Sequence, residues 1–406
     1  MRILYVIGEL ALGGAERHLA LVLPRLRRCG IQPFVYALVD KGDLAAELEA
    51  GGVPVRTVIG ASALQRLPRP VRRFVRLPLT LLALVLWIVR LRPAMIHMFL
   101  PEAYLIGSLA AFIGRVPCRI MSRRSRNHYQ QRHPQLGRVE CWLHRHTDLL
   151  LGNSSRVVAD LLGEGAPAER VRLLYNGIDA SGRPCSRDRK PSPSMVRKML
   201  GLAQEALVIT VVANLIPYKG HADLIAALGI IQRQLPRNWV MVSVGEDRGI
   251  LPALRDMTAA AGIEDHVRWL GKRRDVEQIL AASDLGVLCS HEEGFSNALL
   301  EGMAAGLPMV VTDVGGNAEA IVDGVCGLVV PPHDPVSLGK ALLKLADNRE
   351  LRIALGTSAR ERVVDFFDVE VCVGNYAMLY QALRVQSPLP TVCPPASLAG
   401  EFRIVA

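Results

Sequence analysis

The chain has few aromatic residues and no apolar run long enough to cross a bilayer. Phe, Trp and Tyr make up 5% of its 406 residues. The longest apolar run, Leu77 to Val89, has 13 residues, whereas a transmembrane helix needs about 20. Proteins that bind single-stranded nucleic acid stack the bases on aromatic side chains, for which this composition offers little material. We therefore expect no membrane-spanning helix and no nucleic-acid partner.

Several other common signatures are missing. The eight cysteines are scattered, with no CxxC pair and no zinc-type spacing, which indicates reduced thiols in a cytoplasmic chain. The first ten residues, MRILYVIGEL, are too quickly polar for a signal peptide and predict a buried parallel strand. No D-x-D motif is present to hold a divalent ion, so we expect no metal and no cofactor.

Length and charge predict two domains, the first of them basic. Half of the residues are apolar, and 406 residues exceed what one core usually organises. The formal net charge is +10, and residues 1–180 hold 25 Lys and Arg against 13 Asp and Glu, so the remainder is slightly acidic. Such asymmetry points to an anionic partner of the first half, for which we prefer an acidic lipid surface.

Six arginines flank the apolar run from Leu77 to Val89. They are Arg69, Arg72, Arg73, Arg76, Arg90 and Arg92. This pattern suits a helix that lies in the headgroup region of an anionic leaflet. A run of this length is also typical of a buried helix in the first domain, and both interpretations stay open.

Strand and helix patterns alternate along both halves, which predicts an α/β protein with two parallel sheets. Strands are expected near Ile3, Phe34, Val55, Met95, Arg119, Leu149 and 171–174, and again at 207–213, 240–244, 267–270, 285–288 and 309–312. The expected boundaries are an N-terminal acceptor-binding domain at 1–180, a linker at 181–205 and a C-terminal domain at 206–365. A helix at 366–386 that can pack back on the first domain and a disordered tail at 387–406 complete the chain.

The segment 290–332 is the most informative part of the sequence. Glu293 and Glu301 lie eight positions apart, across a glycine turn at Gly294 and a run of strong helix formers. The amides and the dipole of a helix N-terminus favour an anion, and phosphate in particular. The two carboxylates can contact different hydroxyl groups of an extended ligand.

The whole segment resembles the donor-site signature of retaining GT-B-fold glycosyltransferases, the glycogen-synthase-like group (glycosyltransferase family 4, group 1). In that signature E-x7-E is followed by a small-residue helix, a PVV-type strand, a GG turn and a DGxxGxLVPP segment. All parts are present here in order, with Met309 in place of the first valine. The resemblance implies two Rossmann-like domains facing a central cleft. It also implies metal-independent transfer from a nucleotide sugar held mainly by the C-terminal domain.

A second landmark, the run from Asn214 to Gly220, resembles the family's GRLxxxKG. The resemblance makes Lys219 the cation on the donor diphosphate. Asn214 stands where the family usually has an arginine, and the loss of that contact is worth about 1.5 to 3 kcal/mol. We expect weaker donor binding, compensation from the basic run Lys272-Arg273-Arg274, or lost activity.

The remaining site residues also come from the resemblance. The implied donor contacts are Gly13 and Gly14 of the GGAE loop, Asn214, Lys219, Gly245, Glu246, Leu270, Gly271, Glu293, Gly294, Phe295, Ser296, Asn297 and Glu301. Glu293 would bind the donor-sugar hydroxyls, Glu301 the ribose hydroxyls, and Lys219 would act with Glu293 in catalysis.

Two histidines are candidate catalytic groups on the acceptor side. His97 is a lone histidine where many members of the family have HxH, and a structural role is its alternative. His128 ends the basic loop 122–128, whose charge suits a phosphate-bearing acceptor such as a polyprenyl-diphosphate sugar.

These expectations describe a retaining glycosyltransferase at the inner face of the cytoplasmic membrane. Its acceptor would be a glycan or a polyprenyl-diphosphate-linked lipid in the synthesis of cell-surface polysaccharide, lipopolysaccharide or glycolipid. Two alternatives remain open. One is a GT-B-fold enzyme of other chemistry, either a sugar-nucleotide epimerase or a phosphorylase. The other is an inactive membrane-docked nucleotide-binding homologue, which the missing arginine motivates.

Overall fold

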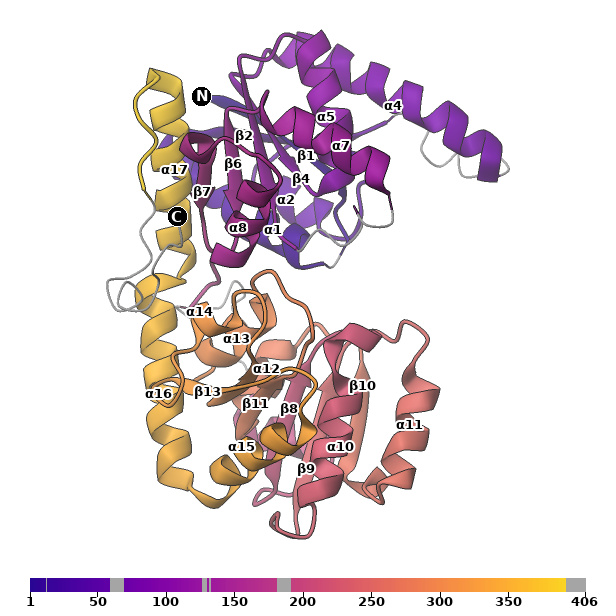
Figure 1. The fold of residues 1–406 in the computed structure, drawn as a ribbon, viewed down its shortest axis with the longest axis vertical. Coiled ribbons are helices and arrows are strands. Elements are labelled where there is room, and N and C mark those ends of the chain that lie inside the picture. The colour runs from indigo at the N-terminus through magenta and orange to yellow at the C-terminus, as the bar shows by residue number, and fades with distance from the viewer. Residues whose placement is uncertain (12, 59–68, 126–129, 131–132, 181–190, 392–406) are drawn as a thin grey trace. The chain divides into compact units, whose positions relative to one another are not determined.

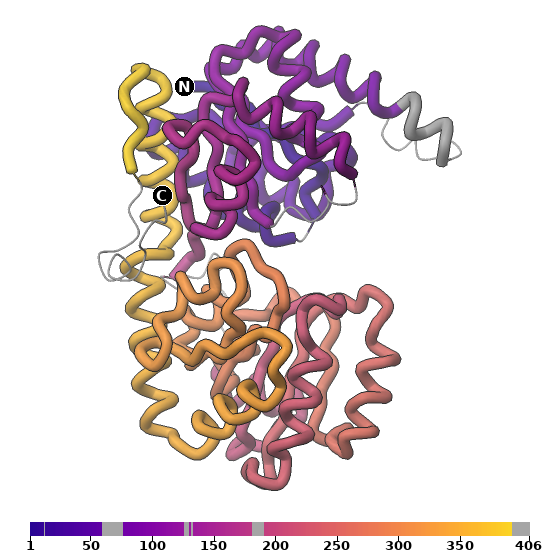
Figure 2. The backbone as a smooth tube through the Cα atoms, in the orientation of Figure 1, coloured from indigo at the N-terminus to yellow at the C-terminus, as the bar shows by residue number. Residues whose placement is uncertain are grey.

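The chain folds into two compact units. The computed structural model describes residues 1–11, 13–58, 69–125, 130, 133–180 and 191–391, with residues 69–75 as backbone only (Figures 1 and 2). The first unit comprises Met1–Gly177 and Val369–Ala406, and the second comprises Ile178–Asp368. The chain therefore leaves the first unit once and returns to complete it with its last helix.

Within its described residues the first unit has a seven-stranded parallel sheet in the order β3-β2-β1-β4-β5-β6-β7. The strands are β1 (Arg2–Glu9), β2 (Gln32–Asp40), β3 (Val55–Thr57), β4 (Met95–Phe99), β5 (Cys118–Arg123), β6 (Leu149–Gly152) and β7 (Val171–Leu173). Most of their residues are buried, as in parallel sheets that are covered on both faces. The strand order reverses between β1 and β4.

Helices cover both faces of this sheet. They are α1 (Gly14–Leu26), α2 (Ala45–Ala50), α4 (Arg69–Leu91), α5 (Pro101–Ile113), α7 (Pro134–His144), α8 (Ser155–Gly163) and α17 (Val369–Val385). One buried cluster joins α1, α2 and α17 to one face of the sheet. A second cluster joins α4, α5, α7 and α8 to the other face.

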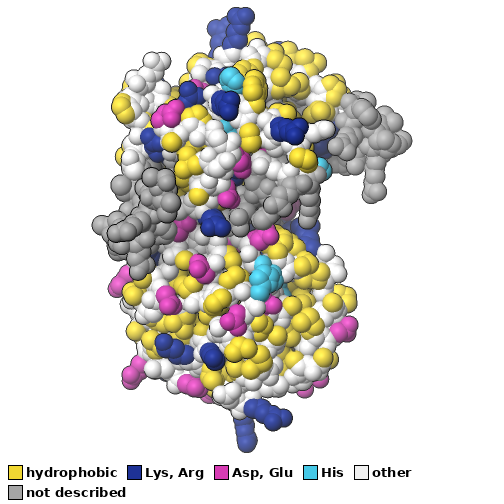
Figure 3. All heavy atoms as spheres, in the orientation of Figure 1, with side chains coloured by type: hydrophobic (Ala, Val, Ile, Leu, Met, Phe, Trp, Pro, Cys, Tyr) yellow, Lys and Arg dark blue, Asp and Glu magenta, His cyan; other side chains and the backbone are white. Residues whose placement is uncertain are grey.

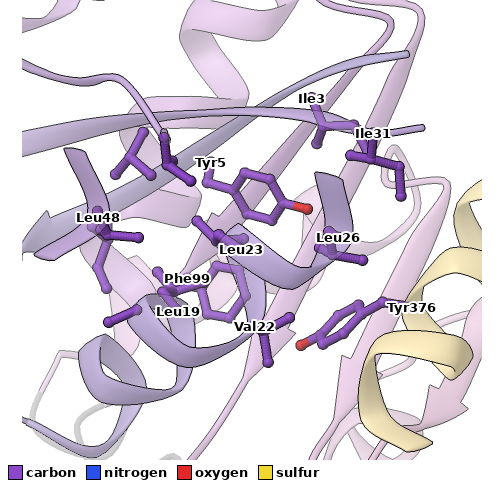
Figure 4. Close-up of a cluster of buried hydrophobic side chains, with 14 of the residues drawn as sticks. Ile3, Tyr5, Leu19, Val22, Leu23, Leu26, Ile31, Leu48, Phe99 and Tyr376 are labelled. Carbon is purple, nitrogen blue, oxygen red and sulfur yellow. The ribbon is translucent and has the colours of Figure 1, made fainter. Parts of the chain in front are cut away.

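The cluster under α1 and α17 is drawn in Figure 4. Leu19 and Leu23 of α1 pack close to Tyr5 of β1 and Phe99 of β4, and Tyr376 reaches in from α17. These side chains are at most 2% exposed. The helix at the end of the chain is therefore part of the core of the first unit.

The second unit has, among its described residues, a six-stranded parallel sheet in the order β10-β9-β8-β11-β12-β13. The strands are β8 (Leu207–Val212), β9 (Trp239–Val244), β10 (Val267–Gly271), β11 (Leu285–Leu288), β12 (Met309–Thr312) and β13 (Gly327–Val330). The order reverses between β8 and β11. Both units thus have the doubly wound topology that the alternating patterns predict, and the predicted fold class is confirmed.

The helices of the second unit again lie on both faces. They are α9 (Pro193–Met199), α10 (His221–Ile231), α11 (Leu251–Ala260), α12 (Val276–Ala281), α13 (Asn297–Ala304), α14 (Asn317–Ala320), α15 (Pro335–Asp347) and α16 (Arg349–Phe366). Residues of α10, α11, α15 and α16 share one core cluster with Val310 of β12. The neighbouring Met309 points to the opposite face, because side chains alternate along a strand.

Met309 explains how β12 and α13 pack without the usual valine. A Cβ atom added at Gly286 of β11 or at Gly302 of α13 would overlap the thioether of Met309. The long methionine side chain therefore fills the space that these two glycines leave. An unbranched thioether suits such an irregular gap.

Two details differ from the expected element pattern. β13, whose four residues follow the Asp323-Gly324 turn, was not among the expected strands. The helix expected at 366–386 is present as α17, which belongs to the first unit, and α16 precedes it in the second unit. The segment expected as a linker contains α9, and Arg197 of this helix binds Asp284 at 2.9 Å.

Residues that follow α17 contact the first unit through Arg172. Arg172 donates to the carbonyl oxygens of Leu389 and Pro390, each at 3.2 Å, and residues 392–406 lie outside the described part. Among the described residues, no helix combines the length and the apolar character needed to cross a bilayer.

The place of α17 in the core of the first unit gives a stability prediction. Leu379 is fully buried, so Leu379→Ala should lower the unfolding free energy of the first unit by about 2 to 5 kcal/mol. Its neighbour Met378 is 52% exposed, and Met378→Ala should change the unfolding free energy by less than about 0.5 kcal/mol. Urea unfolding followed by circular dichroism measures both; equal effects of the two variants would contradict this packing.

Candidate functional site

The strongest candidate site lies at the carboxyl edge of the sheet in the second unit. In doubly wound sheets, ligands bind outside the carboxyl ends of the strands where the strand order reverses. Here that point lies between β8 and β11. The short 3-10 helix Pro217–Lys219 follows β8, and the loop with Glu293 follows β11. Lys219 and Glu293, two of the four residues predicted to act in catalysis, therefore follow adjacent strands.

Lys219 and Glu293 form a direct ion pair. The Lys219 Nζ atom lies 2.6 Å from Glu293 Oε1, and their side chains are 19% and 9% exposed. The Ser290 hydroxyl donates to the same carboxylate oxygen at 2.7 Å. Thr312 in turn donates to the Ser290 carbonyl oxygen. The pair is thus partly desolvated, which strengthens its electrostatic interactions, and Ser290 orients its carboxylate.

Two glycines let the loops around this pair approach closely. Gly220 follows Lys219 with a φ of +71°, and a Cβ atom there would overlap the carbonyl oxygen of Cys289. Gly315 has a φ of +55°, and a Cβ atom there would overlap the carbonyl oxygen of Glu293. Both positions need a residue without a side chain for their backbone conformation and for space.

Helix α13 begins directly beside Glu293. The Ser296 hydroxyl caps it by accepting from the amide of Leu299 at 3.4 Å, which confirms that the helix starts at this turn. Phe295 is buried and packs against Phe367 at a ring-centroid distance of 5.3 Å, so it anchors the turn. Glu301 is half-buried one turn into the helix. The first amides of α13 and its dipole favour an anion next to Lys219.

The loops after β8, β9 and β10 are tied to one another. The Asn214 side-chain oxygen accepts a hydrogen bond from the amide of Glu246 at 3.0 Å, and the amide of Gly245 donates to the Gly271 carbonyl oxygen at 3.0 Å. Asn214 therefore holds the loop after β9 through its side-chain oxygen, which accepts a hydrogen bond. An arginine at this position could not accept this bond, because its side chain has only donors. Leu270 precedes Gly271 at the end of β10.

Among the three cations considered as substitutes for the arginine, Arg273 has a carboxylate partner. Its guanidinium contacts the Asp275 carboxylate at 2.7 and 2.8 Å, which lowers the pKa of that carboxyl group. Lys272 and Arg274 are exposed. Lys219 is thus the cation that the structure holds against the start of α13.

In the first unit, Gly13 follows β1 and His97 lies within β4, the two strands between which the order reverses. Gly13 is the N-cap of α1, and Gly14 is its first residue. His97 of β4 is fully buried, with Nδ1 2.7 Å from the Tyr380 hydroxyl and Nε2 2.8 Å from the Ser122 hydroxyl. Burial lowers the pKa of His97 well below its usual value, so the ring is neutral.

Other polar groups lie around His97. Arg124 binds the side-chain oxygen of Asn176, and burial lowers the pKa of its guanidinium. Burial also raises the pKa of Glu16 in the GGAE loop, an effect that the charge of Arg124 opposes. His128 lies outside the described residues.

The structure thus distributes the predicted site residues over both units. The second unit brings Lys219, Glu293 and the start of α13 together, and Asn214, Gly245, Glu246 and Gly271 form the neighbouring loops. Gly13, Gly14 and His97 belong to the first unit. Two contacts were missed from the sequence. The first is the hydrogen bond from Ser290 to Glu293, which only the position of Ser290 three residues before Glu293 could have suggested. The second is the contact of His97 with Tyr380, which lies 283 residues away in the sequence.

The close approach at Gly220 can be tested by substitution. Gly220→Ala should lower the unfolding free energy of the second unit by about 2 to 4 kcal/mol, because a left-handed backbone and an overlap with Cys289 both oppose it. Gly262 has a similar φ of +65° with no atom within 4 Å of an added Cβ. Gly262→Ala should therefore cost only about 1 kcal/mol. Thermal and urea unfolding compare the variants, and equal losses would show that the overlap is not real.

Two family models match most of the chain. The model described as Glycosyltransferase Family 4 matches residues 12–181, and that described as Glycosyl transferases group 1 matches residues 195–362.

The chain is also similar to individual glycosyltransferases over half of its length. It is 30% identical over 230 residues to a D-inositol 3-phosphate glycosyltransferase of Salinispora arenicola, covering 54% of this chain and 51% of that protein. It is also 30% identical over 218 residues to an N-acetyl-alpha-D-glucosaminyl L-malate synthase of Bacillus anthracis. This match covers 53% of this chain and 54% of that protein. The chain thus spans about half the length of these curated relatives.

A solved structure resembles nearly the whole chain. It is that of the Anabaena protein HepE in complex with UDP, with a TM-score of 0.79 and 25% identity. The match covers 94% of this chain and 100% of that one. Both family models and the two parallel sheets agree with the resemblance found in the sequence. This chain belongs to the group 1 glycosyltransferases of family 4, and it has the GT-B fold.

Proposed function

We propose that this chain transfers a sugar from a nucleoside diphosphate sugar to a hydroxyl group of an acceptor, with retention of the anomeric configuration. The observation that carries the proposal is the Lys219–Glu293 pair at the start of α13, where the strand order reverses. Family membership supports the reaction, and HepE, a structural relative, was solved with UDP bound. Retention rests on the resemblance of segment 290–332 to the donor signature.

The site suits a diphosphate leaving group. Transfer places growing negative charge on the diphosphate, and a fixed cation together with aligned amides stabilises that charge. Lys219 supplies the ammonium group, and the first turn of α13 supplies the amides. These groups provide the electrostatic stabilisation from the protein itself, so we propose that the transfer step needs no metal ion at the diphosphate.

Donor binding would change the partner of Lys219. Its ammonium group now contacts Glu293, and a diphosphate offers it more negative charge than one carboxylate does. Glu293 would then be free to accept hydrogen bonds from donor-sugar hydroxyls. Ser290 still donates to Glu293 Oε1 and keeps the carboxylate oriented. The ion pair thus holds both side chains in place before the donor arrives, which reduces the ordering that binding requires.

The acceptor side belongs to the first unit in this proposal. His97 is buried with both ring nitrogens bonded, so we propose that it acts by positioning Ser122 and Tyr380. The names of the two relatives include an inositol phosphate and malate, both of which are anionic. Together with the basic first unit, this favours an anionic acceptor, and a polyprenyl-diphosphate-linked one would place the chain in cell-surface glycan synthesis.

The surface of α4 supports a lipid-associated acceptor. Leu79, Leu82, Leu86 and Val89 are 43% to 56% exposed and recur at helical spacing along one side of the helix. The opposite side is buried through Leu84 and Ile88. A stripe of this kind with nearby arginines is typical of a helix that lies on an anionic leaflet.

The exposed apolar surface continues from α4 onto its neighbours. Helix α5 contacts both α4 and α7. It exposes Phe112 and Ile113, and α7 exposes Trp142, whose ring lies 6.3 Å from that of Phe112. Exposed arginines in this region include Arg90, Arg92, Arg115, Arg138 and Arg145. We propose that this surface, formed by α4, α5 and α7, docks on the headgroups of acidic lipids at the inner face of the cytoplasmic membrane.

A second candidate function is a nucleotide-binding homologue without transfer activity. The specific observation for it is Asn214, which replaces an arginine and bonds the neighbouring loop instead of an anion. Such a protein would bind a nucleoside diphosphate and show neither transfer nor hydrolysis. An assay for release of nucleoside diphosphate from the donor separates the two functions.

The roles of the ion pair predict the kinetics of its variants. Lys219→Ala and Glu293→Gln should each lower kcat/KM for donor consumption about 10² to 10³ fold, because each removes a contact to charge or hydroxyls in the transition state. Lys340 of α15 is exposed, and Lys340→Ala should leave the rate unchanged. The measurement is release of nucleoside diphosphate with a panel of nucleotide sugars and lipid-linked acceptors. Full turnover by either site variant, with folding verified by its melting temperature, would contradict the assignment.

The exposed stripe predicts a charge-dependent membrane interaction. The chain should float with vesicles that contain anionic lipid and should not float with zwitterionic ones. The double variant Leu82→Glu, Leu86→Glu should lose this binding. A matched control is Ile230→Glu, Ile353→Glu, which changes two exposed apolar residues of the second unit by the same charge. Equal binding by both double variants would rule out docking through α4.

A further inference from the structure

A second polar cluster lies near the carboxyl edge of the sheet in the second unit. It consists of Asp223, His291 and His333, each of which offers one ligand atom, and these atoms all lie within 4.8 Å of one another. Asp223 is in the first turn of α10, His291 follows β11, and His333 follows β13. None of the three belongs to the donor contacts described above.

The side chains already face one another. His291 Nε2 lies 2.8 Å from Asp223 Oδ2, and the rings of His291 and His333 have centroids 3.7 Å apart with an interplanar angle of 37°. Asp223 and His291 are 21% and 19% exposed. Two imidazoles from loops and a carboxylate from the first turn of α10 form the donor set of three-ligand zinc sites.

His333 reaches this cluster from an unusual backbone conformation. Its φ of +59° is in the left-handed region, which residues other than glycine seldom adopt. Such a conformation is a cost that recurs at ligand sites. His333 is also exposed, so an ion can reach the cluster from solvent. Figure 3 shows histidine atoms at the surface of the second unit on the face that it draws.

We propose that Asp223, His291 and His333 bind one divalent transition-metal ion, with Zn²⁺ as the best fit. Three protein ligands leave the fourth position of a tetrahedral ion to water. Imidazole nitrogen and carboxylate oxygen suit Zn²⁺, and without thiolates they do not select soft ions such as Cu(I). Small side-chain rotations bring ligand atoms that lie within 4.8 Å of one another onto a common ion.

The other cluster of similar composition fits an ion poorly. It consists of Cys141, His144 and Glu164 in the first unit. The Glu164 carboxylate is already bound by the guanidinium of Arg123 at 2.6 and 2.9 Å. His144 Nδ1 lies 3.1 Å from the Tyr104 hydroxyl, and its Nε2 lies 3.0 Å from Glu164. A buried arginine beside these groups opposes a second cation.

Metal binding at the first cluster would stabilise the loops that carry Lys219 and Glu293. The amide of His291 donates to the Tyr218 carbonyl oxygen at 2.7 Å, directly before Lys219. Asp223 lies four residues after Lys219, and His291 two residues before Glu293. An ion would therefore join the segments after β8, β11 and β13, and it would stabilise the folded second unit by mass action. This site goes beyond the proposed transfer reaction, and neither Lys219 nor Glu293 is among its ligands.

The test is metal binding by the full chain after treatment with a chelator. Titration with Zn²⁺, followed by calorimetry, should show one site of micromolar or tighter affinity, and the melting temperature should rise with added Zn²⁺. Added Co²⁺ should give the visible absorption of a tetrahedral ion. His291→Ala and His333→Asn should lose the site and the thermal shift, since asparagine tolerates the left-handed backbone but lacks the imidazole.

Two control variants separate this site from other side chains that could bind Zn²⁺. Cys141→Ser removes one member of the second cluster, and His146→Ala removes an exposed histidine of the first unit. Both should bind Zn²⁺ as the unmodified chain does. The proposal is overturned if the unmodified chain binds no Zn²⁺ at micromolar concentration, or if His291→Ala and His333→Asn both bind it unchanged. Metal binding is measured without donor or acceptor, so this outcome is independent of whether the chain transfers sugar.

Discussion

The site depends on the contact between two loops that leave adjacent strands, β8 and β11. That contact is the ion pair between Lys219 and Glu293, which places an ammonium group beside the first turn of α13. A lone exposed pair would contribute little, because water screens it and side-chain entropy opposes it. Here both side chains are mostly buried, and Ser290 holds the carboxylate. Their partial burial is what makes the charges effective toward a diphosphate.

The sheet topology explains why these two loops meet. The strand order reverses between β8 and β11, so the chain leaves these strands toward opposite faces and opens a space above their carboxyl ends. Glycines then set how closely the loops approach, since Gly220 and Gly315 lie against backbone carbonyls. The first unit follows the same rule at β1 and β4, where the GGAE loop and His97 lie. In that unit the polar groups are closed off by tyrosines of α17.

Much of this could be predicted from the sequence. The strands are continuous apolar runs, and the segment 290–332 has a long and ordered signature, so the fold class and the family were predicted correctly. Local patterns failed where distant residues decide the outcome. The environment of His97 is set by Tyr380, which lies 283 residues away. The role of Asn214 depends on the neighbouring loop after β9. The cluster of Asp223, His291 and His333 has no sequence spacing that reveals it, because its members come from three segments that are far apart in the sequence.

The most direct test of the central claim is amide hydrogen exchange of the chain with and without a nucleoside diphosphate such as UDP. The account predicts slower exchange at the start of α13, from Gly294 to Leu300, and in the loop that contains Lys219. Both segments should return to their original exchange rates in Lys219→Ala at the same UDP concentration. Protection confined to other segments, or unchanged protection in Lys219→Ala, would contradict the account.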